Sequence, residues 1–432
     1  MAGRSATRLL CLLGMFSLSL PMPVGALDRY VSGVGGDSGN DCLSATSPCR
    51  TITHAVGQAA AGDSINVAAG KYRDNVRIVQ GTTLSFLGGW DPTFTRRDPR
   101  GTPSTVKGGS VSLPGFRGRD RVWTILAENG TSISVSIDGF VLRGGMASTN
   151  FGITGSVTDK PYYRSGGGLG VQALEHSSVS LAVSNTTIAK NRSITEGGGV
   201  YVDAVDGSTV DATFTNVWIY QNKPKGGIGG LYGSVLGYAG SEPASATLAL
   251  RNCVIAANKG RNLGGGMYFV NVGPPGSSFT VDVVASTITG NFAVGPGTIT
   301  PGSYTPGGGG ITLADGLAPL TLNLRDSIVW GNAATGAAVG DDVFEYDVYP
   351  GSSATLNISN SDVGDVVLAG ASFNDLGGNL DVDPSFADLP HLAAGSPLID
   401  VGSCADAPST DFEGDPRPVG ASCDVGADEF VP

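Results

Sequence analysis

A seven-residue pattern of polar and apolar positions recurs through the middle of the chain. It begins with a polar residue, carries Ile or Val at the fourth position and ends with Asn or Gly. The clearest copies are DGFVLRG at 138–144, NTTIAKN at 185–191, NVWIYQN at 216–222 and NCVIAAN at 252–258. Looser copies are ASTITGN at 285–291, DSIVWGN at 326–332 and the fragment NSDV at 360–363. A spacing of about 30–40 residues with variable insertions indicates a repeat architecture.

Two further features accompany the copies in register. An alternating run such as STVDATFTN precedes each one, with the period-two pattern of a strand that has one buried face. A glycine cluster and an aliphatic run follow, at 165–171, 196–202, 226–232, 263–269 and 307–313. No helical stretch and no Asn-Gly turn separates the strands, so hairpins are not favoured. If each unit makes one turn of a coil, equivalent strands stack in parallel about 4.8 Å apart.

The repeated asparagines have a structural explanation in such a coil. An Asn in one turn lies above its equivalent in the next, and its amide can donate to that neighbour's oxygen to form a ladder. Asn also tolerates the left-handed backbone of tight corners, and the glycine clusters allow positive φ. Ile188, Ile219 and Ile255 should then stack in the core. The ladder residues that we predict are Asn185, Asn191, Asn216, Asn222, Asn252, Asn258, Asn291 and Asn332.

Composition and charge narrow the class of partner. The 432 residues include 67 Gly and 24 Pro, which disfavours long helices, and only 15% are charged. The formal net charge is −12, and it becomes −14 without Arg4 and Arg8. Such a surface repels nucleic-acid phosphates and anionic lipid, so we expect no nucleic-acid partner.

The N-terminus and the cysteines indicate secretion. Two arginines precede an apolar run, Leu9–Leu20, and small residues follow up to Ala26, the layout of a signal peptide too short to span a bilayer. After its removal we expect no membrane-spanning segment. In an oxidising compartment Cys42 can pair with Cys49, and Cys404 with Cys423. Cys253 would remain a buried free thiol, and the spacing is poor for zinc.

The ends of the chain resemble a known family. The coil needs a cap, and Ile52, Ala55, Val56 and Ala59 have helical spacing before Gly62. The segment from YVSGVGG to DNVRI resembles the start of bacterial right-handed parallel β-helix proteins of the pectate-lyase-like superfamily. LGGWDPTFTRRDPRG resembles a segment that commonly follows it. The tail, DPSFADLPHLAAGSPLIDVG with DFEGDPRP and CDVGADEF, is similar to the C-terminal signature of choice-of-anchor Q domain proteins.

We therefore predict an all-β protein, a right-handed single-stranded parallel β-helix with an N-terminal helical cap and an irregular C-terminal cap. The resemblance and the general preference for right-handed parallel crossovers both support the handedness. We expect a signal peptide at 1–26, a cap with first turns at 27–110, repeats at 111–370 and a C-terminal cap at 371–432. The resemblance implies a protein displayed at a bacterial surface. The chain ends at DEFVP without an apolar anchor, so we expect free secretion or periplasmic residence.

Candidate chemistry is sparse. Asp411, Glu413 and Asp415 alternate in DFEGDPRP, which suits either a Ca²⁺ loop or a polar turn whose Asp side chains bond the backbone. Asp341, Asp342, Glu345 and Asp347 form a second acidic group, which we interpret as a soluble loop tip. The three histidines form no metal or nucleophile set. Aromatic residues in or near successive turns could stack on sugars or in the core, namely Tyr162, Tyr163, Tyr201, Trp218, Tyr220, Tyr232, Tyr238 and Tyr268.

The sequence therefore favours a secreted, monomeric β-helix that binds carbohydrate or serves in adhesion or as a structural module. It assigns no catalytic residue and no cofactor, with Ca²⁺ as the one candidate ion. The alternative is a polysaccharide lyase or another carbohydrate-active enzyme that acts on acidic glycans, which would need acids and a base converging on one groove.

Overall fold

The computed structural model describes residues 25–113, 116–147, 165–238, 240–261, 264–294, 307–316, 318–335, 341–348 and 354–432. The predicted signal peptide at 1–26 lies outside the described residues except for its last two positions. Tyr162 and Tyr163 also lie outside them.

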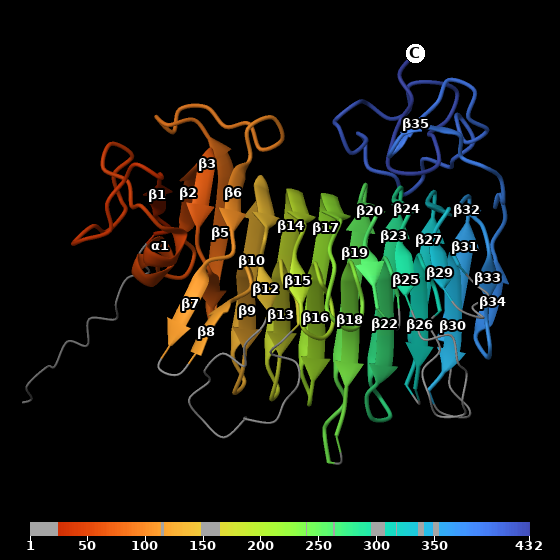
Figure 1. Cartoon of the computed structure of the whole chain (residues 1–432), viewed down its shortest axis with the longest axis horizontal. Coiled ribbons are helices and arrows are strands. Elements are labelled where there is room, and N and C mark those ends of the chain that lie inside the picture. The colour runs from red at the N-terminus through yellow and green to blue at the C-terminus, as the bar shows by residue number, and fades with distance from the viewer. Residues whose placement is uncertain are drawn as a thin grey trace, which may run out of the picture.

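The chain winds into a right-handed parallel β-helix, with α1 (Ile52–Gln58) at one end and strands stacked along a single axis (Figure 1). Long strands form one face of the coil. This long-strand face consists of β1 (Asp28–Val31), β2 (Ser64–Ala68), β5 (Thr82–Trp90), β10 (Ser132–Asp138), β14 (Ser178–Ala189), β17 (Thr209–Tyr220), β19 (Ser245–Arg251), β23 (Ser278–Val284), β27 (Leu320–Arg325), β31 (Ala354–Ser359) and β34 (Ser372–Asp375).

Short strands form a second face after a sharp corner. This short-strand face consists of the last residues of β14 and β17 with β3 (Gly70–Arg73), β6 (Ser104–Lys107), β11 (Phe140–Arg143), β20 (Val254–Ala256), β24 (Thr287–Thr289), β28 (Ile328–Trp330) and β32 (Asp362–Val363). Smaller parallel sets line the next corner: β12 (Met146–Ala147) with β15 (Arg192–Ser193), and β21 (Lys259–Gly260), β25 (Phe292–Val294) and β29 (Ala333–Thr335).

A nine-stranded sheet forms the third face. It consists of β4 (Val76–Ile78), β9 (Trp123–Ala127), β13 (Leu169–Ala173), β16 (Val200–Val205), β18 (Leu231–Leu236), β22 (Met267–Val272), β26 (Ile311–Asp315), β30 (Val343–Asp347) and β33 (Val366–Val367). Antiparallel pairing in the described residues is confined to two hairpins and isolated bridges. The hairpins are β7 (Ser110–Leu113) with β8 (Phe116–Arg119), and β35 (Phe386–Asp388) with β36 (His391–Leu392).

The register of the stack follows the sequence repeat with one exception. Ile188 pairs with Ile219, and Ile219 with Ile255, so these side chains lie one above another in the core. In the first copy, however, Leu142 rather than Val141 pairs with Ile188. The predicted frame 138–144 is therefore wrong by one residue, because Gly139, at φ 83°, takes the left-handed corner that Asn185 occupies in the next turn.

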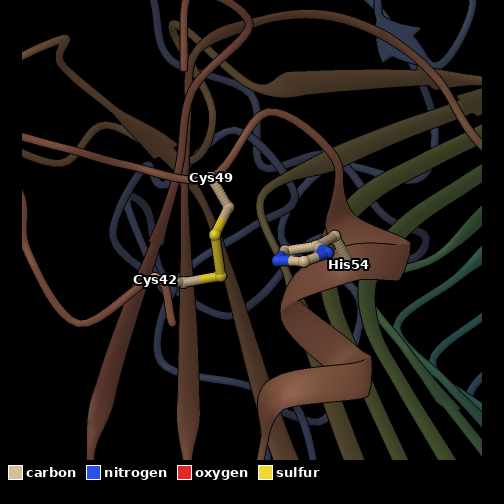
Figure 2. Close-up of side chains that lie close together, drawn as sticks. All are labelled: Cys42, Cys49 and His54. Atoms are coloured by element: carbon tan, nitrogen blue, oxygen red, sulfur yellow. A yellow bond between two sulfur atoms is a disulfide. The ribbon is translucent and has the colours of Figure 1, made fainter. Parts of the chain in front are cut away.

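The N-terminal cap is a short amphipathic helix, as its spacing predicts. Helix α1 begins after Thr51, whose hydroxyl accepts the His54 backbone N–H, and it buries Ile52 and Ala55 against the end of the coil. Figure 2 shows the Cys42–Cys49 disulfide with the His54 ring directed toward it from α1. Because both sulfurs are bonded to each other, this group does not offer the thiolates that a zinc site needs.

The residues after β34 form an irregular C-terminal lobe, residues 376–432, tied by the Cys404–Cys423 disulfide. The lobe folds back against the short-strand face near β20, β24 and β28 (Figure 1). Phe412 and Ala427 pack on Val254 and Ala256 there. Within the described chain the longest helix has seven residues, too few to cross a membrane.

Candidate functional site

The predicted asparagines separate into two hydrogen-bonded ladders with different roles. In the outer ladder, Asn216 Nδ2 donates to Asn185 Oδ1 (3.2 Å) and Asn252 Nδ2 donates to Asn216 Oδ1 (3.1 Å). These three residues have φ between 43° and 56° and form the left-handed corner between the long-strand and short-strand faces.

The inner ladder is fully buried and runs through five turns. Amide bonds of 2.9–3.2 Å join Asn191, Asn222, Asn258, Asn291 and Asn332 in order. In this ladder the left-handed conformation belongs to the preceding residue, such as Lys190 or Gln221, and not to the Asn. The ladder ends on Asp342, whose Oδ1 accepts from Asn332 Nδ2 at 2.8 Å.

The glycine clusters are explained by the inner ladder. A β-carbon on Gly199 would lie 2.8 Å from Asn222 Nδ2, and one on Gly310 would lie equally close to Asn332 Nδ2. Each ladder amide therefore packs against a glycine of the cluster that precedes it in the sequence, where a larger residue would clash. The asparagines and glycines of the inner ladder therefore have a structural role in the coil.

The cysteines lie where the sequence places them. Both predicted disulfides are present, and Cys253 is a buried free thiol in the coil core. Burial raises the pKa of the Cys253 thiol to about 12, so at neutral pH it is protonated and unreactive.

An open cleft of about 430 Å³ lies on the short-strand face. The loop between β5 and β6 bounds it on one side and the C-terminal lobe bounds it on the other; both project from the same side of the coil (Figure 1). Its lining residues come from the loop (Pro99, Arg100, Gly101, Pro103), the strands (Phe140, Asn185, Thr186, Thr187, Asn216, Trp218) and the lobe (Phe412, Glu413).

The cleft combines an aromatic floor with polar and charged walls. Trp218 is partly exposed, and its ring centroid lies 5.6 Å from that of Phe412. Exposed Arg100 reaches over the outer ladder, where its Nε donates to Asn185 Oδ1 at 3.0 Å. An apolar ring flanked by a cation, a carboxylate and amides can bind a sugar through stacking and hydrogen bonds.

His391 lies in the C-terminal lobe and contacts Phe412 and Glu413, the two lobe residues that line the cleft. Its Nε2 lies 3.1 Å from Glu413 Oε2, its Nδ1 contacts Asp388, and its ring packs on Phe412. Burial opposes protonation of His391, but the three neighbouring carboxylates of Asp388, Asp428 and Glu413 outweigh it and raise the His391 pKa. Burial raises the pKa of Asp428 to about 6. The group can hold a proton near neutral pH.

The predicted calcium residues do not converge on a common point. Asp411 is buried, and its Oδ1 accepts the backbone N–H groups of Glu413, Gly414 and Asp415 at 2.8–2.9 Å. Its Oδ2 accepts the N–H of Glu429. Asp411 thus organises the turn, Glu413 faces His391, and calcium binding by Asp411, Glu413 and Asp415 remains a prediction.

The second acidic group is not the loop tip that we expected. Asp342 ends the inner ladder, and Glu345 is a fully buried residue of β30. Glu345 Oε2 accepts the backbone N–H groups of Ala369, Gly370 and Ala371. Strand pairing brings Asp315 of β26 opposite Asp347, so the carboxylates of Asp315, Glu345 and Asp347 lie within 4.8 Å of one another.

Burial and proximity favour the protonated forms of Asp315 and Asp347 in this group. Burial and the neighbouring Glu345 raise the pKa of Asp315 to about 7, and the same two causes raise the pKa of Asp347. The sequence does not reveal this convergence, because Asp315 and Asp347 lie 32 positions apart and meet only through the pairing of β26 with β30.

Comparison with solved structures gives distant likenesses. The crystal structure of pectate lyase Pel9A has a TM-score of 0.41 and 15% identity, covering 94% of this chain and 97% of that one. The tailspike protein gp49 of Acinetobacter baumannii bacteriophage Fri1, a capsular polysaccharide depolymerase, has a TM-score of 0.23 and 10% identity, covering 74% of this chain and 57% of that one. No family model and no curated protein matches the chain. These scores are too low to transfer an activity.

Proposed function

We propose that this chain is a secreted β-helix that binds carbohydrate in the cleft between the β5–β6 loop and the C-terminal lobe. The observation that carries the proposal is the partly exposed Trp218 on the cleft floor, flanked by Arg100 and Glu413. A sugar ring can stack on the indole while its hydroxyl groups bond to the charged and amide side chains.

The lobe belongs to the binding site in this proposal. It supplies Phe412 and Glu413, and the Asp411 turn and His391 hold them in place. We propose that the lobe is a choice-of-anchor Q-type domain, that residues 1–26 direct secretion, and that the two disulfides form in the oxidising compartment beyond.

A glycan array followed by calorimetry on the best ligand tests this function. We expect Trp218→Ala and Arg100→Ala each to weaken binding at least tenfold, because each removes a contact made only in the cleft. Phe373→Ala, which alters a half-exposed ring on β34 outside the cleft, is the matched control and should bind like the wild type. Equal binding by all three variants would rule out the cleft as the site.

A second candidate is cleavage of an acidic polysaccharide, which the His391–Glu413 pair at the cleft favours. A hydrogen-bonded imidazole and carboxylate can transfer a proton to or from a bound sugar, and Arg100 can bind its carboxylate. Incubation with polygalacturonate or alginate would then release unsaturated uronide, detected by ultraviolet absorbance, and His391→Ala would abolish the release. Binding without release identifies the protein as a binding module.

A further inference from the structure

Cations occur at the same place in successive turns of the coil. Arg192, Lys223 and Lys259 are each the residue that follows a member of the inner ladder. The backbone N–H groups of Lys223 and Lys259 bind the carbonyls of the ladder asparagines one turn earlier, at 2.9 and 3.0 Å. These three positions therefore lie one above another at the corner after the short-strand face.

The row continues toward the N-terminus on the adjoining strands. Arg73 of β3 pairs with Lys107 of β6, and Lys107 pairs with Arg143 of β11. Arg143 in turn pairs with Ala189, three residues before Arg192, so the row steps sideways there. We call Arg73, Lys107, Arg143, Arg192, Lys223 and Lys259 the basic edge. It places one cation in each of six consecutive turns. Paired strands lie about 4.8 Å apart, and the step from Arg143 to Arg192 is longer because Arg192 pairs with Met146.

The C-terminal half of the basic edge, Arg192, Lys223 and Lys259, has no acidic residue in its own segments, whereas Asp74 lines the same hollow as Arg73 at the other end. No Asp or Glu occurs at 186–195, 217–225 or 254–261, although the whole chain has 38 acidic and 26 basic residues. Within the described ranges none of the six edge residues forms an ion pair. Five of the six are exposed, and Lys107 is half-buried. Unpaired, aligned cations create a local positive field that the net negative charge does not cancel at short range.

The edge is also hollowed and carries an aromatic ring. A cavity of about 320 Å³ lies between Lys223, Lys259 and Arg261 over the small residues of the corner. Phe292 follows in the next turn, with its ring centroid 5.1 Å from Lys259 Nζ. Lys225 and Arg261 add a second cation to two of the turns.

We propose that the basic edge binds a linear acidic polysaccharide that lies along the coil axis. A polymer with one carboxylate or sulfate per sugar presents anions in a single file, as the edge presents cations, and its rings can contact Phe292. The remaining surface, with its net negative charge, repels the broad anionic face of a duplex nucleic acid or a membrane. This surface lies beside the Trp218 cleft and goes beyond the function proposed for the cleft.

Binding to polygalacturonate and heparin, with neutral dextran as the comparison polymer, tests the edge. We expect binding to both polyanions that weakens steeply with salt, and none to dextran. Lys223→Gln with Lys259→Gln should weaken binding at least tenfold and make the salt dependence shallower. The matched control, Arg96→Gln with Arg251→Gln, removes one exposed and one half-buried cation that do not belong to the edge, and it should change binding less than twofold. Thermal unfolding verifies that both double variants are folded.

Each other result overturns the proposal. Equal losses in the two double variants would mean that only net charge matters, and no polyanion binding at low salt would leave the edge without a partner. Tighter binding to single-stranded DNA than to either polysaccharide would identify a nucleic-acid surface instead. Trp218→Ala separates this proposal from the one for the cleft, since it should leave the salt-dependent binding intact.

Discussion

At the scale of single residues, the inner asparagine ladder is the strongest constraint on the coil. Asn222 is fully buried; its Oδ1 accepts from the backbone and amide nitrogens of Asn191, and its Nδ2 donates to Ile188 and Asn258. Each buried polar group that loses its partner costs about 1–3 kcal/mol. One side chain thus bonds to groups in the turn before its own and in the turn after it.

We expect Asn222→Ala to lower the free energy of unfolding by at least about 2 kcal/mol, because the buried donors of Asn191 and the carbonyl of Ile188 lose their hydrogen-bond partner. The measurement is urea unfolding followed by circular dichroism. Asn357→Ala is the matched control, since Asn357 belongs to a similar amide ladder on the outer surface of β31 and bonds to Asn323 and Asn374. Water can replace those bonds, so its cost should stay below about 1 kcal/mol. Equal costs would contradict this role of burial.

The residue scale also separates what a pattern can predict from what it cannot. The spacing of Asn191, Asn222 and Asn258 predicts their stacking, because one repeat per turn of the coil places equivalent residues directly above one another. It does not predict which residue takes the left-handed corner, and Gly139 moved the first copy by one position. A glycine adopts that conformation without strain, so local backbone freedom decided the register there.

At the scale of elements, the meeting of β26 and β30 places Asp315, Glu345 and Asp347 together. When folding raises the pKa of a carboxyl group, the free energy of unfolding decreases as pH rises from the ordinary pKa to the raised one. For Asp315 this range runs from 3.8 to about 7. The contact between β26 and β30 should therefore contribute less to the free energy of unfolding at pH 8 than at pH 5.

We expect Glu345→Gln to reduce that loss. A glutamine keeps an oxygen for the backbone N–H groups of Ala369 and Gly370, and its amide can donate to Asp315 in place of the repulsion. Its melting temperature should fall less between pH 5 and pH 8 than that of the wild type. Glu242→Gln, which removes one exposed charge elsewhere, should follow the wild type. A variant whose melting temperature falls as much as that of the wild type between pH 5 and pH 8 would contradict this assignment.

At the scale of the whole molecule, buried carboxyl groups dominate the response to pH. Burial raises the pKa of Glu196 and Asp315 to about 7 and of Asp362 and Asp428 to about 6. The folded state therefore binds more protons than the unfolded state between about pH 4 and 7, and stability falls as pH rises through that range. Burial lowers the pKa of His391, but its carboxylate neighbours raise it further, so the loss of its proton also lowers stability as pH rises.

We expect the melting temperature to be highest near pH 5 and to decline toward pH 8. Below pH 4 it should fall again. Although burial opposes the shift, hydrogen bonds lower the pKa of Asp37 and Asp63, and their stabilisation is lost as these groups become protonated. Calorimetric scans from pH 3 to 8 in the absence of divalent cations measure the profile. A melting temperature that rises steadily to pH 8 would contradict the assignment.

The cleft could not be predicted from the sequence. Trp218 is one of the repeated aromatic residues and Glu413 one of the calcium candidates, whereas no motif marks Arg100 or Phe412 or joins the four. Arg100 and Glu413 lie more than 300 residues apart in the chain, and the stacking of the coil and the docking of the lobe together bring them to one cleft. The basic edge left a local signal, a cation directly after the Asn in NR, NKPK and NKGR, which becomes visible once the ladder register is known.

The coil, its period, the buried aliphatic stack, the helical cap and the two disulfides all follow from local features of the amino-acid sequence. Periodicity and spacing are local properties, and a solenoid contacts mainly its neighbouring turns, so local rules suffice. Only the tertiary structure decided where the lobe docks, which carboxylates meet and how the faces become a cleft and a charged edge. Those contacts join segments far apart in the chain, and side-chain packing, not repeat spacing, selects them.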